Sequence, residues 1–459
     1  MTGIIIISLL AIVILFLGVY KQNRILVPTS IVGLTSALTT YVLAWDKNMY
    51  YFNQMMLIDN YAVAFSTLII FITILILLLS PGYFEKISNN IAEYIALLLF
   101  ALVGALCMIA YNDLSMLFIG IEIMSVSMYV LAGIRKKDLM SNEAALKYLL
   151  MGSFATGFLL FGIALIYGFT GSFNLDSINS IVSLSNGETA GLFSAGLLFI
   201  IVGLSFKVSA APFHFWAPDV YDGSPSLITL NMSTVVKTAS FAAFLRLFLH
   251  AFSAASLSVA PTLWAITLLT IIVGNVIALY QDSFKRMLAY SSISHAGYMM
   301  MAILALGPDS GNAIFYYATA YSIASISAFA ILIKVKSMKN SESFDAFNGL
   351  AKSNPMTALF LTISMCSLAG IPLTAGFFGK FFIFTTVLAQ KYYWLTGIAL
   401  ITAVIGIWYY FRVIIAMYMK SSDDDQKIEF STSYKIVLWI AAGLTILFGI
   451  YPAFLSSLF

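Results

Sequence analysis

Residues 203–225 read GLSFKVSAAPFHFWAPDVYDGSP and lie inside an apolar segment that runs from residue 191 to 222. A transmembrane helix needs about 20 residues to cross a bilayer, so this segment is too long for one straight span. Pro212 and Pro218 interrupt it, because proline removes a backbone donor and clashes with the preceding turn. The stretch therefore predicts two half-helices joined by unwound chain, with Lys207 close to the break.

A second segment of the same kind runs from residue 355 to 389. Gly370, Pro372, Gly376 and Gly379 interrupt it. Broken helices at matching places in two halves of a chain are typical of inverted-repeat transporters. The alternative is that these residues only kink two helices so that they pack.

The composition indicates an integral membrane protein. The chain is 61% hydrophobic and only 9% charged, and its mean hydropathy is +0.97. Apolar runs of about 20 residues recur along its whole length, which excludes a soluble fold. The formal charge of +3 is too small to suggest nucleic acid as a partner. Cys107 and Cys366 lie in apolar runs without metal-binding spacing, so we expect neither a disulfide nor a bound metal.

The apolar runs predict an all-α polytopic membrane protein with fourteen transmembrane helices. The expected spans are roughly 2–20, 25–45, 58–80, 92–110, 112–133, 143–168, 191–222, 226–250, 261–280, 284–306, 312–335, 355–389, 392–418 and 434–455.

The spans group into four parts. We expect an N-terminal three-helix segment over 1–91, a first five-helix bundle over 92–250, a second bundle over 261–418 and a C-terminal helix over 434–459. Each bundle has its broken helix as the fourth member. Because five is an odd number, the second bundle must be inverted relative to the first.

Basic residues orient the spans, since loops on the cytoplasmic side are rich in lysine and arginine. With both termini outside, the external loops keep only Lys47 and Lys391. The cytoplasmic loops then hold Lys21, Arg24, Lys86, Arg135, Lys136, Lys137, Lys285, Arg286, Lys334, Lys336, Lys339, Lys352, Lys420, Lys427 and Lys435. Both termini are thus predicted on the periplasmic side.

Five ionisable residues lie inside apolar segments: Glu122, Lys147, Lys207, Lys237 and Lys380. A charged side chain at the centre of a membrane helix costs about 2.5–3.5 kcal/mol on insertion scales, so each is a candidate functional residue. Burial also disfavours the ammonium form of lysine, which suits proton exchange near neutral pH. The pattern therefore predicts a protein that moves protons.

Several candidates also have a purely structural alternative. Lys147 can pair with Glu143 one turn earlier or extend to the interface. A carboxylate such as Glu122 can form a structural salt bridge. His295 has an unperturbed pKa near 6.5 and could pass protons from the first bundle to the second, or it could be a satisfied core histidine. Arg246 and Arg412, near helix ends, are expected to extend to the interface.

Five stretches stand out: LFIGIEIMSVSMYVLAG (117–133), EAALKYLLMGSFATGFLLFG (143–162), the stretch at 203–225, QDSFKRMLAYSSISHAGYMM (281–300) and SLAGIPLTAGFFGKFFIF (367–384). Together they resemble the antiporter-like subunits of respiratory complex I, and the resemblance covers about 92–418.

The resemblance implies a role for each candidate. Glu122 would pair with Lys207, and the two would form a switch that loads a proton. Lys237 and His295 would continue the row, and Lys380 would be the terminal lysine facing the exit path. Proton translocation would be coupled to quinone reduction elsewhere in the complex.

The resemblance also implies the surroundings of the chain. The complex would lie in the bacterial inner membrane, with the antiporter-like subunit M and the small subunit K as neighbours. FMN, iron–sulfur clusters and quinone would sit on other subunits, because this chain has no dinucleotide fingerprint, P-loop or cysteine cluster. Two other classes stay open: a subunit of a related cation/proton antiporter, and a purely structural membrane scaffold.

Overall fold

The computed structural model describes residues 1–459 except 88–89, 185–190, 253–255, 422–426 and 457–459. Within this described part, helices dominate and the only sheet is a hairpin of β1 (Met49–Tyr51) and β2 (Met56–Ile58). Eleven described helical segments are long and apolar enough to cross a membrane. The all-α polytopic fold is confirmed, whereas the count of fourteen spans and the inverted repeat stay predictions.

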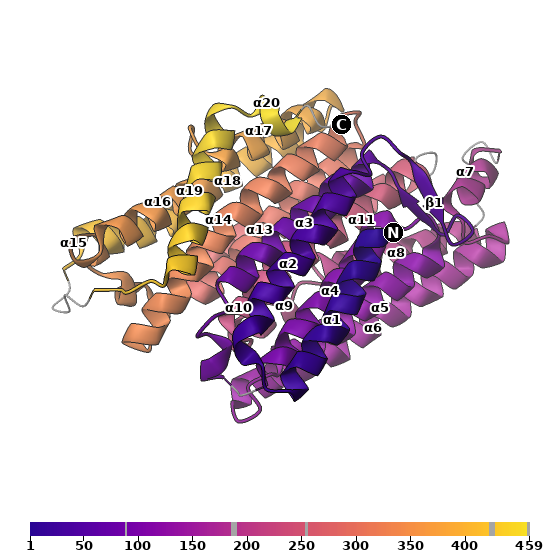
Figure 1. The fold of residues 1–459 in the computed structure, drawn as a ribbon. Coiled ribbons are helices and arrows are strands. Elements are labelled where there is room, and N and C mark those ends of the chain that lie inside the picture. The colour runs from indigo at the N-terminus through magenta and orange to yellow at the C-terminus, as the bar shows by residue number, and fades with distance from the viewer. Residues whose placement is uncertain (88–89, 185–190, 253–255, 422–426, 457–459) are drawn as a thin grey trace. The chain divides into compact units, whose positions relative to one another are not determined.

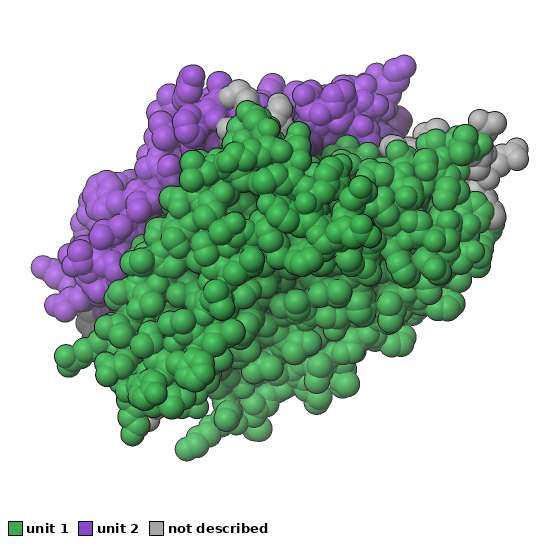
Figure 2. Space-filling model, turned by 45° about the vertical axis from the view of Figure 1, so that its right-hand side comes forward, with its two compact units in different colours: residues 1–228, 235–266, 459 green, residues 229–234, 267–458 purple. Residues whose placement is uncertain are grey.

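The chain divides into two compact units (Figure 2). Unit 1 comprises residues 1–228 and 235–266. Unit 2 comprises residues 229–234 and 267–458.

Unit 1 begins with two exposed apolar helices that pack with α4 (Figure 1). Its helices are α1 (Thr2–Val19), α2 (Asn23–Val42), α3 (Asn60–Leu78), the 3-10 turn Phe84–Lys86, α4 (Ile91–Ala110), α5 (Leu114–Ala132), α6 (Leu139–Thr170), α7 (Leu175–Leu184), α8 (Gly191–Lys207), α9 (Trp216–Gly223) and α11 (Lys237–His250). Two short pieces, α10 (Ser226–Asn231) and a π-helical turn (Met232–Val236), and the long helix α12 (Ser256–Leu279) fall at the division between the units.

Aspartates begin three helices of unit 1, because their carboxylates accept backbone N–H groups that have no partner in the first turn. Asp59 accepts from Ala62 at 2.7 Å at the start of α3. Asp113 and Asp138 do the same for α5 and α6. The caps fix where these helices start.

Close approach of glycines packs the helices of unit 1. A Cβ added to Gly104 on α4 would lie 2.4 Å from the backbone nitrogen of Met124 on α5. Gly162 on α6 and Gly196 on α8 approach each other in the same way. In a membrane, no hydrophobic driving force favours contact between helices over contact with lipid. Small residues help because they let two helix backbones approach closely.

Unit 2 has α14 at its centre, in contact with α16, α17 and α19. Its helices are α13 (Phe284–Ala305), α14 (Ser310–Lys339), the 3-10 turn Phe344–Phe347, α15 (Leu350–Ser353), α16 (Pro355–Ala369), α17 (Ala375–Ala389), α18 (Tyr393–Met419), α19 (Thr432–Ile450) and α20 (Ala453–Ser456). Nearly every residue of α13 and most residues of α14 are buried. The interior of unit 2 therefore lies around these two helices.

Candidate functional site

The first break in unit 1 lies between α8 and α9, as predicted. Residues 208–215 connect the two half-helices and contain a cis Ala211–Pro212 bond. The indole Nε1 of Trp216 donates to the carbonyl of Phe206 at 3.0 Å. This bond occupies one of the carbonyls that the end of α8 leaves without an intrahelical partner.

Lys207 is the last residue of α8 and is buried. Its Nζ donates to the Ser125 hydroxyl at 2.7 Å and lies 3.4 Å from the Tyr129 hydroxyl. Both hydroxyls come from α5. The ammonium therefore lies among groups that can both donate and accept hydrogen bonds.

No ion pair within 4.0 Å joins Glu122 to Lys207 among the described contacts, although the two charges lie close enough to interact electrostatically, so their pairing stays a prediction. Ser125 and Tyr129 follow Glu122 by one and two turns of α5, and they bind the ammonium instead. The Oε1 of Glu122 is buried without a described hydrogen-bond partner, although the side chain as a whole is partly exposed. Glu122 lies between Ile119 and Val126, both exposed.

Lys237 belongs to the same break. It is 2% exposed and begins α11 directly after the π-helical turn. Its Nζ donates at 3.0 Å to the hydroxyl of Ser209, in the segment that connects α8 and α9. The break thus has one lysine at its start and a second, from another helix, in contact with its unwound chain.

Lys147 lies in a different environment. Its side chain is 39% exposed and forms ion pairs with Glu143 at 2.7 Å and with Asp219 at 2.8 Å. The pair with Glu143 was the structural alternative given above, and the structure contains it. Asp219 on α9 is a partner that the sequence did not indicate. Lys147 is therefore ion-paired with α9, the second half-helix, and is partly exposed, unlike the buried lysines.

The second break lies in unit 2 between α16 and α17, also as predicted. Lys380 on α17 is buried, and its Nζ donates to the carbonyls of Leu368 at 3.2 Å and Ala369 at 2.7 Å. These carbonyls end α16, where the helix dipole favours a cation. Gly370 follows with φ +85, and a Cβ there would lie 2.9 Å from the Lys380 side chain.

His295 on α13 is buried between two tyrosines. Its Nδ1 lies 2.6 Å from the hydroxyl of Tyr317, and its Nε2 lies 2.9 Å from that of Tyr410. Tyr410 is also hydrogen-bonded to Ser291. Ser291 is thus linked to the imidazole of His295 through the Tyr410 hydroxyl. Hydroxyls on both ring nitrogens can exchange donor and acceptor roles, as proton transfer requires.

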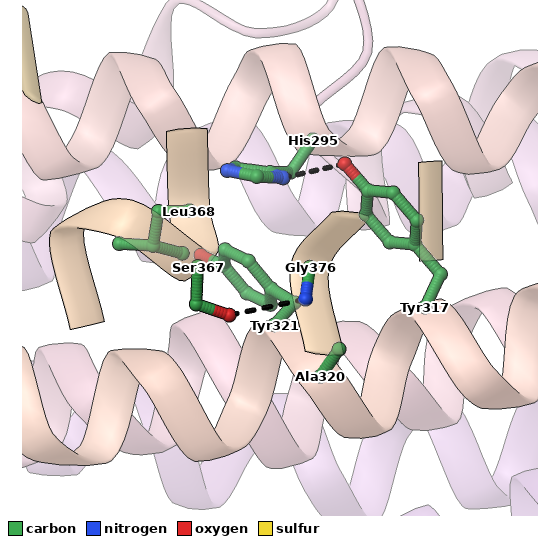
Figure 3. Close-up of a pocket in the computed structure, with 7 residues that line it drawn as sticks. All are labelled: His295, Tyr317, Ala320, Tyr321, Ser367, Leu368 and Gly376. Carbon is green, nitrogen blue, oxygen red and sulfur yellow. Dashed lines mark hydrogen bonds between the residues drawn. The ribbon is translucent and has the colours of Figure 1, made fainter. Parts of the chain in front are cut away.

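A small cavity joins His295 to the second break (Figure 3). It has about 10 Å³ of water-accessible space, enough for about one water molecule. Figure 3 shows His295 and Tyr317 pointing toward each other, and the Ser367 hydroxyl accepting from the Gly376 N–H. The lining residues are His295, Tyr317, Ala320, Tyr321, Ser367, Leu368 and Gly376. Leu368, whose carbonyl binds Lys380, thus lines the same cavity as His295.

Sequence reasoning missed buried ion pairs, among them that of Arg246. Arg246 was expected to extend to the interface, but it is 1% exposed and pairs with Asp59. The two residues lie 187 positions apart, so no local pattern could have revealed the pair. Arg412 fits its expectation better, because it is partly exposed and pairs with the exposed Asp282.

Comparisons with known proteins identify the family. Residues 111–406 match the family described as NADH:quinone oxidoreductase/Mrp antiporter, TM. The chain belongs to this family. It is 40% identical to a Cytophaga hutchinsonii protein named NADH-quinone oxidoreductase subunit N, over 100% of this chain and 99% of that one. A Flavobacterium psychrophilum protein of the same name is 38% identical over 98% of both chains.

A solved structure agrees with these relatives. A chain of respiratory complex I from Thermus thermophilus with bound aureothin matches with a TM-score of 0.84 and 29% identity, over 99% of this chain and 98% of that one. The chain is thus a multi-pass membrane protein with the fold of a membrane subunit of such complexes. Among the described residues, no group of three or more His, Cys, Asp or Glu side chains could hold a metal ion.

Proposed function

We propose that this chain is subunit N of a proton-translocating NADH-quinone oxidoreductase and carries protons through buried lysines at its two broken helices. The observation that carries the proposal is the position of Lys207, Lys237 and Lys380. Each ammonium is buried and bonded to a broken helix or to hydroxyls beside one. Residues at such sites are costly in a membrane and mark ion paths.

The proposed path has one part in each unit. In unit 1 a proton moves between Lys207 and Lys237, with Ser125 and Ser209 as their hydroxyl partners. Glu122 acts on Lys207 from the same helix face as Ser125. A shift of α5 or α8 that brings Glu122 onto the ammonium would hold the proton, and the reverse shift would release it.

In unit 2 the path runs from His295 through the cavity to Lys380. A water in the cavity could hydrogen-bond the tyrosine and serine hydroxyls that line it. The energy comes from quinone reduction on other subunits. FMN, iron–sulfur clusters and the quinone site are proposed to lie there, with subunits M and K as the neighbours of this chain.

The topology belongs to the same proposal. Both termini face the periplasm, fourteen helices span the inner membrane, and the bundles at 92–250 and 261–418 are inverted repeats. Lys147 is proposed as an accessory of the path, because its ion pair with Asp219 holds α9 beside α6.

Removing the carboxylate and the first lysine tests the function. Glu122→Ala and Lys207→Ala should each strongly lower the number of protons pumped per NADH oxidised by the intact complex in liposomes, while the complex still assembles. Lys391→Ala, an exposed loop lysine, is the control and should pump normally. Normal pumping by a fully assembled Glu122→Ala/Lys207→Ala double variant would refute the proposal.

A subunit of a cation/proton antiporter is the second candidate, because the family description includes Mrp antiporters. The two candidates differ in their partners. If the chain is part of an NADH-quinone oxidoreductase, iron–sulfur subunits should co-purify with it in mild detergent. Recovery with antiporter subunits alone would favour the second candidate.

A further inference from the structure

Lys380 lies in a part of unit 2 whose described helices carry no acidic residue. Helices α13, α14, α16, α18 and α19 pack against α17, which carries Lys380. Neither α17 nor any of these five helices contains aspartate or glutamate. Two backbone carbonyls of α16 accept from the ammonium, which has three donors. A further partner of negative character is therefore of consequence for its charge.

The aromatic ring of Tyr298 on α13 supplies this partner. The Nζ of Lys380 lies over the ring, 5.4 Å from its centroid. The face of an aromatic ring carries partial negative charge and attracts an ammonium within about 6 Å. A neutral amine has no net charge for the ring to attract. The contact therefore favours the protonated form of Lys380.

Two contacts fix the position of the Tyr298 ring. Phe384, one turn after Lys380 on α17, packs edge to face with it, and the two centroids lie 6.0 Å apart. The Tyr298 hydroxyl accepts from the Nδ2 of Asn275 on α12 at 3.2 Å. Asn275 is buried. The ring thus leaves Lys380 only if the hydrogen bond to a buried amide breaks.

The amide of Asn275 is itself fixed in one orientation. Its Nδ2 also donates to the carbonyl of Ile271 at 2.9 Å, and a carbonyl can only accept, so the nitrogen must lie on this side. Its Oδ1 accepts from the hydroxyl of Tyr409 on α18 at 3.1 Å. Gly406 leaves room for this contact, because a Cβ there would lie 3.0 Å from Oδ1. Asn275 therefore connects α12 to both α13 and α18.

We propose that the ring of Tyr298 takes the place of a carboxylate beside Lys380 and sets how tightly Lys380 holds its proton, with Asn275 as the positioning residue that keeps the ring there. The proposal rests on the function proposed above, in which Lys380 carries protons. Tyr298 and Asn275 themselves transfer no proton. A movement of α13 or α17 that separates the ring from the ammonium favours release of the proton.

Other titratable groups surround this contact, and none of them is a carboxylate. Most are phenols and a thiol, which stay neutral near pH 7 at their unperturbed pKa values, whereas histidine has an unperturbed pKa near 6.5. Titration of the histidine therefore acts on the acid side of a pH profile, and titration of a lysine acts on the alkaline side. The groups are His295 on α13, Tyr317 on α14, Cys366 on α16, Tyr409 and Tyr410 on α18, and Tyr434 and Lys435 in the first turn of α19.

Removing the ring tests the proposal through the pH dependence of pumping. The number of protons pumped per NADH oxidised is measured for the intact complex in liposomes at neutral and alkaline pH. This ratio cancels the pH dependence of electron transfer. Tyr298→Leu weakens the hold of Lys380 on its proton, so the alkaline fall of the ratio should move to lower pH by roughly one unit. Tyr298→Phe keeps the ring and should shift it less.

Tyr316→Phe is the matched control. It removes the hydroxyl of another buried tyrosine of unit 2, which donates to the carbonyl of Phe448 at 2.7 Å, and it should not shift the profile. An unchanged alkaline fall in Tyr298→Leu, or equal shifts in Tyr298→Leu and Tyr316→Phe, would overturn the proposal.

The role of Asn275 is tested against Tyr298→Phe, because Asn275→Ala and Tyr298→Phe remove the same hydrogen bond. Asn275→Ala should move the alkaline fall to lower pH at least as far as Tyr298→Phe does. The double variant should shift no further than Asn275→Ala alone, since the shared bond is already lost. A double variant whose shift equals the sum of the two would contradict the positioning role.

If Tyr298→Leu does not assemble, the electrostatic part is tested with pentafluorophenylalanine at position 298. Its ring is close in size to that of phenylalanine, but the fluorines remove the negative charge from the face. We expect the alkaline fall to lie at lower pH than in Tyr298→Phe, and equal profiles would overturn the proposal.

Lys380→Ala separates this proposal from the function itself. Normal pumping by Lys380→Ala would refute the path through unit 2 and this proposal with it. Loss of pumping in Lys380→Ala, together with an unchanged profile in Tyr298→Leu, would refute this proposal alone.

Discussion

The two broken helices bind their lysines in opposite ways. In unit 1, Lys207 ends the first half-helix and reaches hydroxyls on α5. In unit 2, Lys380 lies on the second half-helix and reaches back to the carbonyls that end the first. The indole of Trp216 binds the Phe206 carbonyl at the end of α8, so Lys207 is not needed there.

The difference matters for proton exchange. A hydroxyl can accept from an ammonium or donate to a neutral amine, whereas a carbonyl can only accept. The site of Lys207 can therefore hydrogen-bond both protonation states. The site of Lys380 favours the ammonium, and the dipole of α16 adds to this preference. The two sites therefore differ in the groups that can hydrogen-bond the neutral amine.

The largest effect is expected at Lys207. Lys207→Arg should lower proton pumping as severely as Lys207→Ala, by roughly 10²-fold or more, because guanidinium stays protonated at any accessible pH. Pumping by the reconstituted complex is measured for both variants. An arginine variant that pumps close to the wild-type rate would show that Lys207 only supplies a charge, and the contrast between the two breaks would then be lost.

The next largest effect is expected for Lys380→Arg, and this substitution separates the charge of the side chain from its deprotonation. Carbonyl acceptors suit guanidinium as well as ammonium, so the end of α16 stays capped and the charge is kept. We expect pumping to fall almost as far as in Lys380→Ala, because only deprotonation has been removed. Proton uptake by vesicles separates the two roles. Rescue by arginine would remove Lys380 from the relay and leave it as a fixed charge.

The smallest effect concerns stability. Lys380→Met leaves the carbonyls of Leu368 and Ala369 without this donor, and we expect a loss of about 1–2 kcal/mol. Lys207→Met should be neutral or slightly stabilising, because the Ser125 and Tyr129 hydroxyls can rotate to other partners and a buried charge is gone. The temperature at which this chain dissociates from the purified complex reports both changes. Equal shifts would contradict the assignment of hydroxyl and carbonyl sites.

Hydropathy and proline placement were enough to predict both breaks and most helix positions. The run from 191 to 222 breaks where Pro212 stands, whereas Pro28 and Pro261 lie inside α2 and α12 without ending these helices. The exceptions are short: the sequence did not indicate the β1–β2 hairpin, the helix α7 or the π-helical turn before Lys237. Such features depend on local contacts more than on hydropathy.

The sequence by itself determined that this is a polytopic membrane protein with buried lysines at two interrupted helices. Apolar runs can be recognised without a structure, and so can the lysines and prolines inside them, which are costly in a membrane helix. Only the tertiary structure decided what the lysines bind. It placed Lys207 on Ser125 instead of Glu122, Lys380 on the carbonyls of α16, and Arg246 on Asp59. These partners are far apart in sequence, and the packing of the helices selects among the polar groups that come within reach.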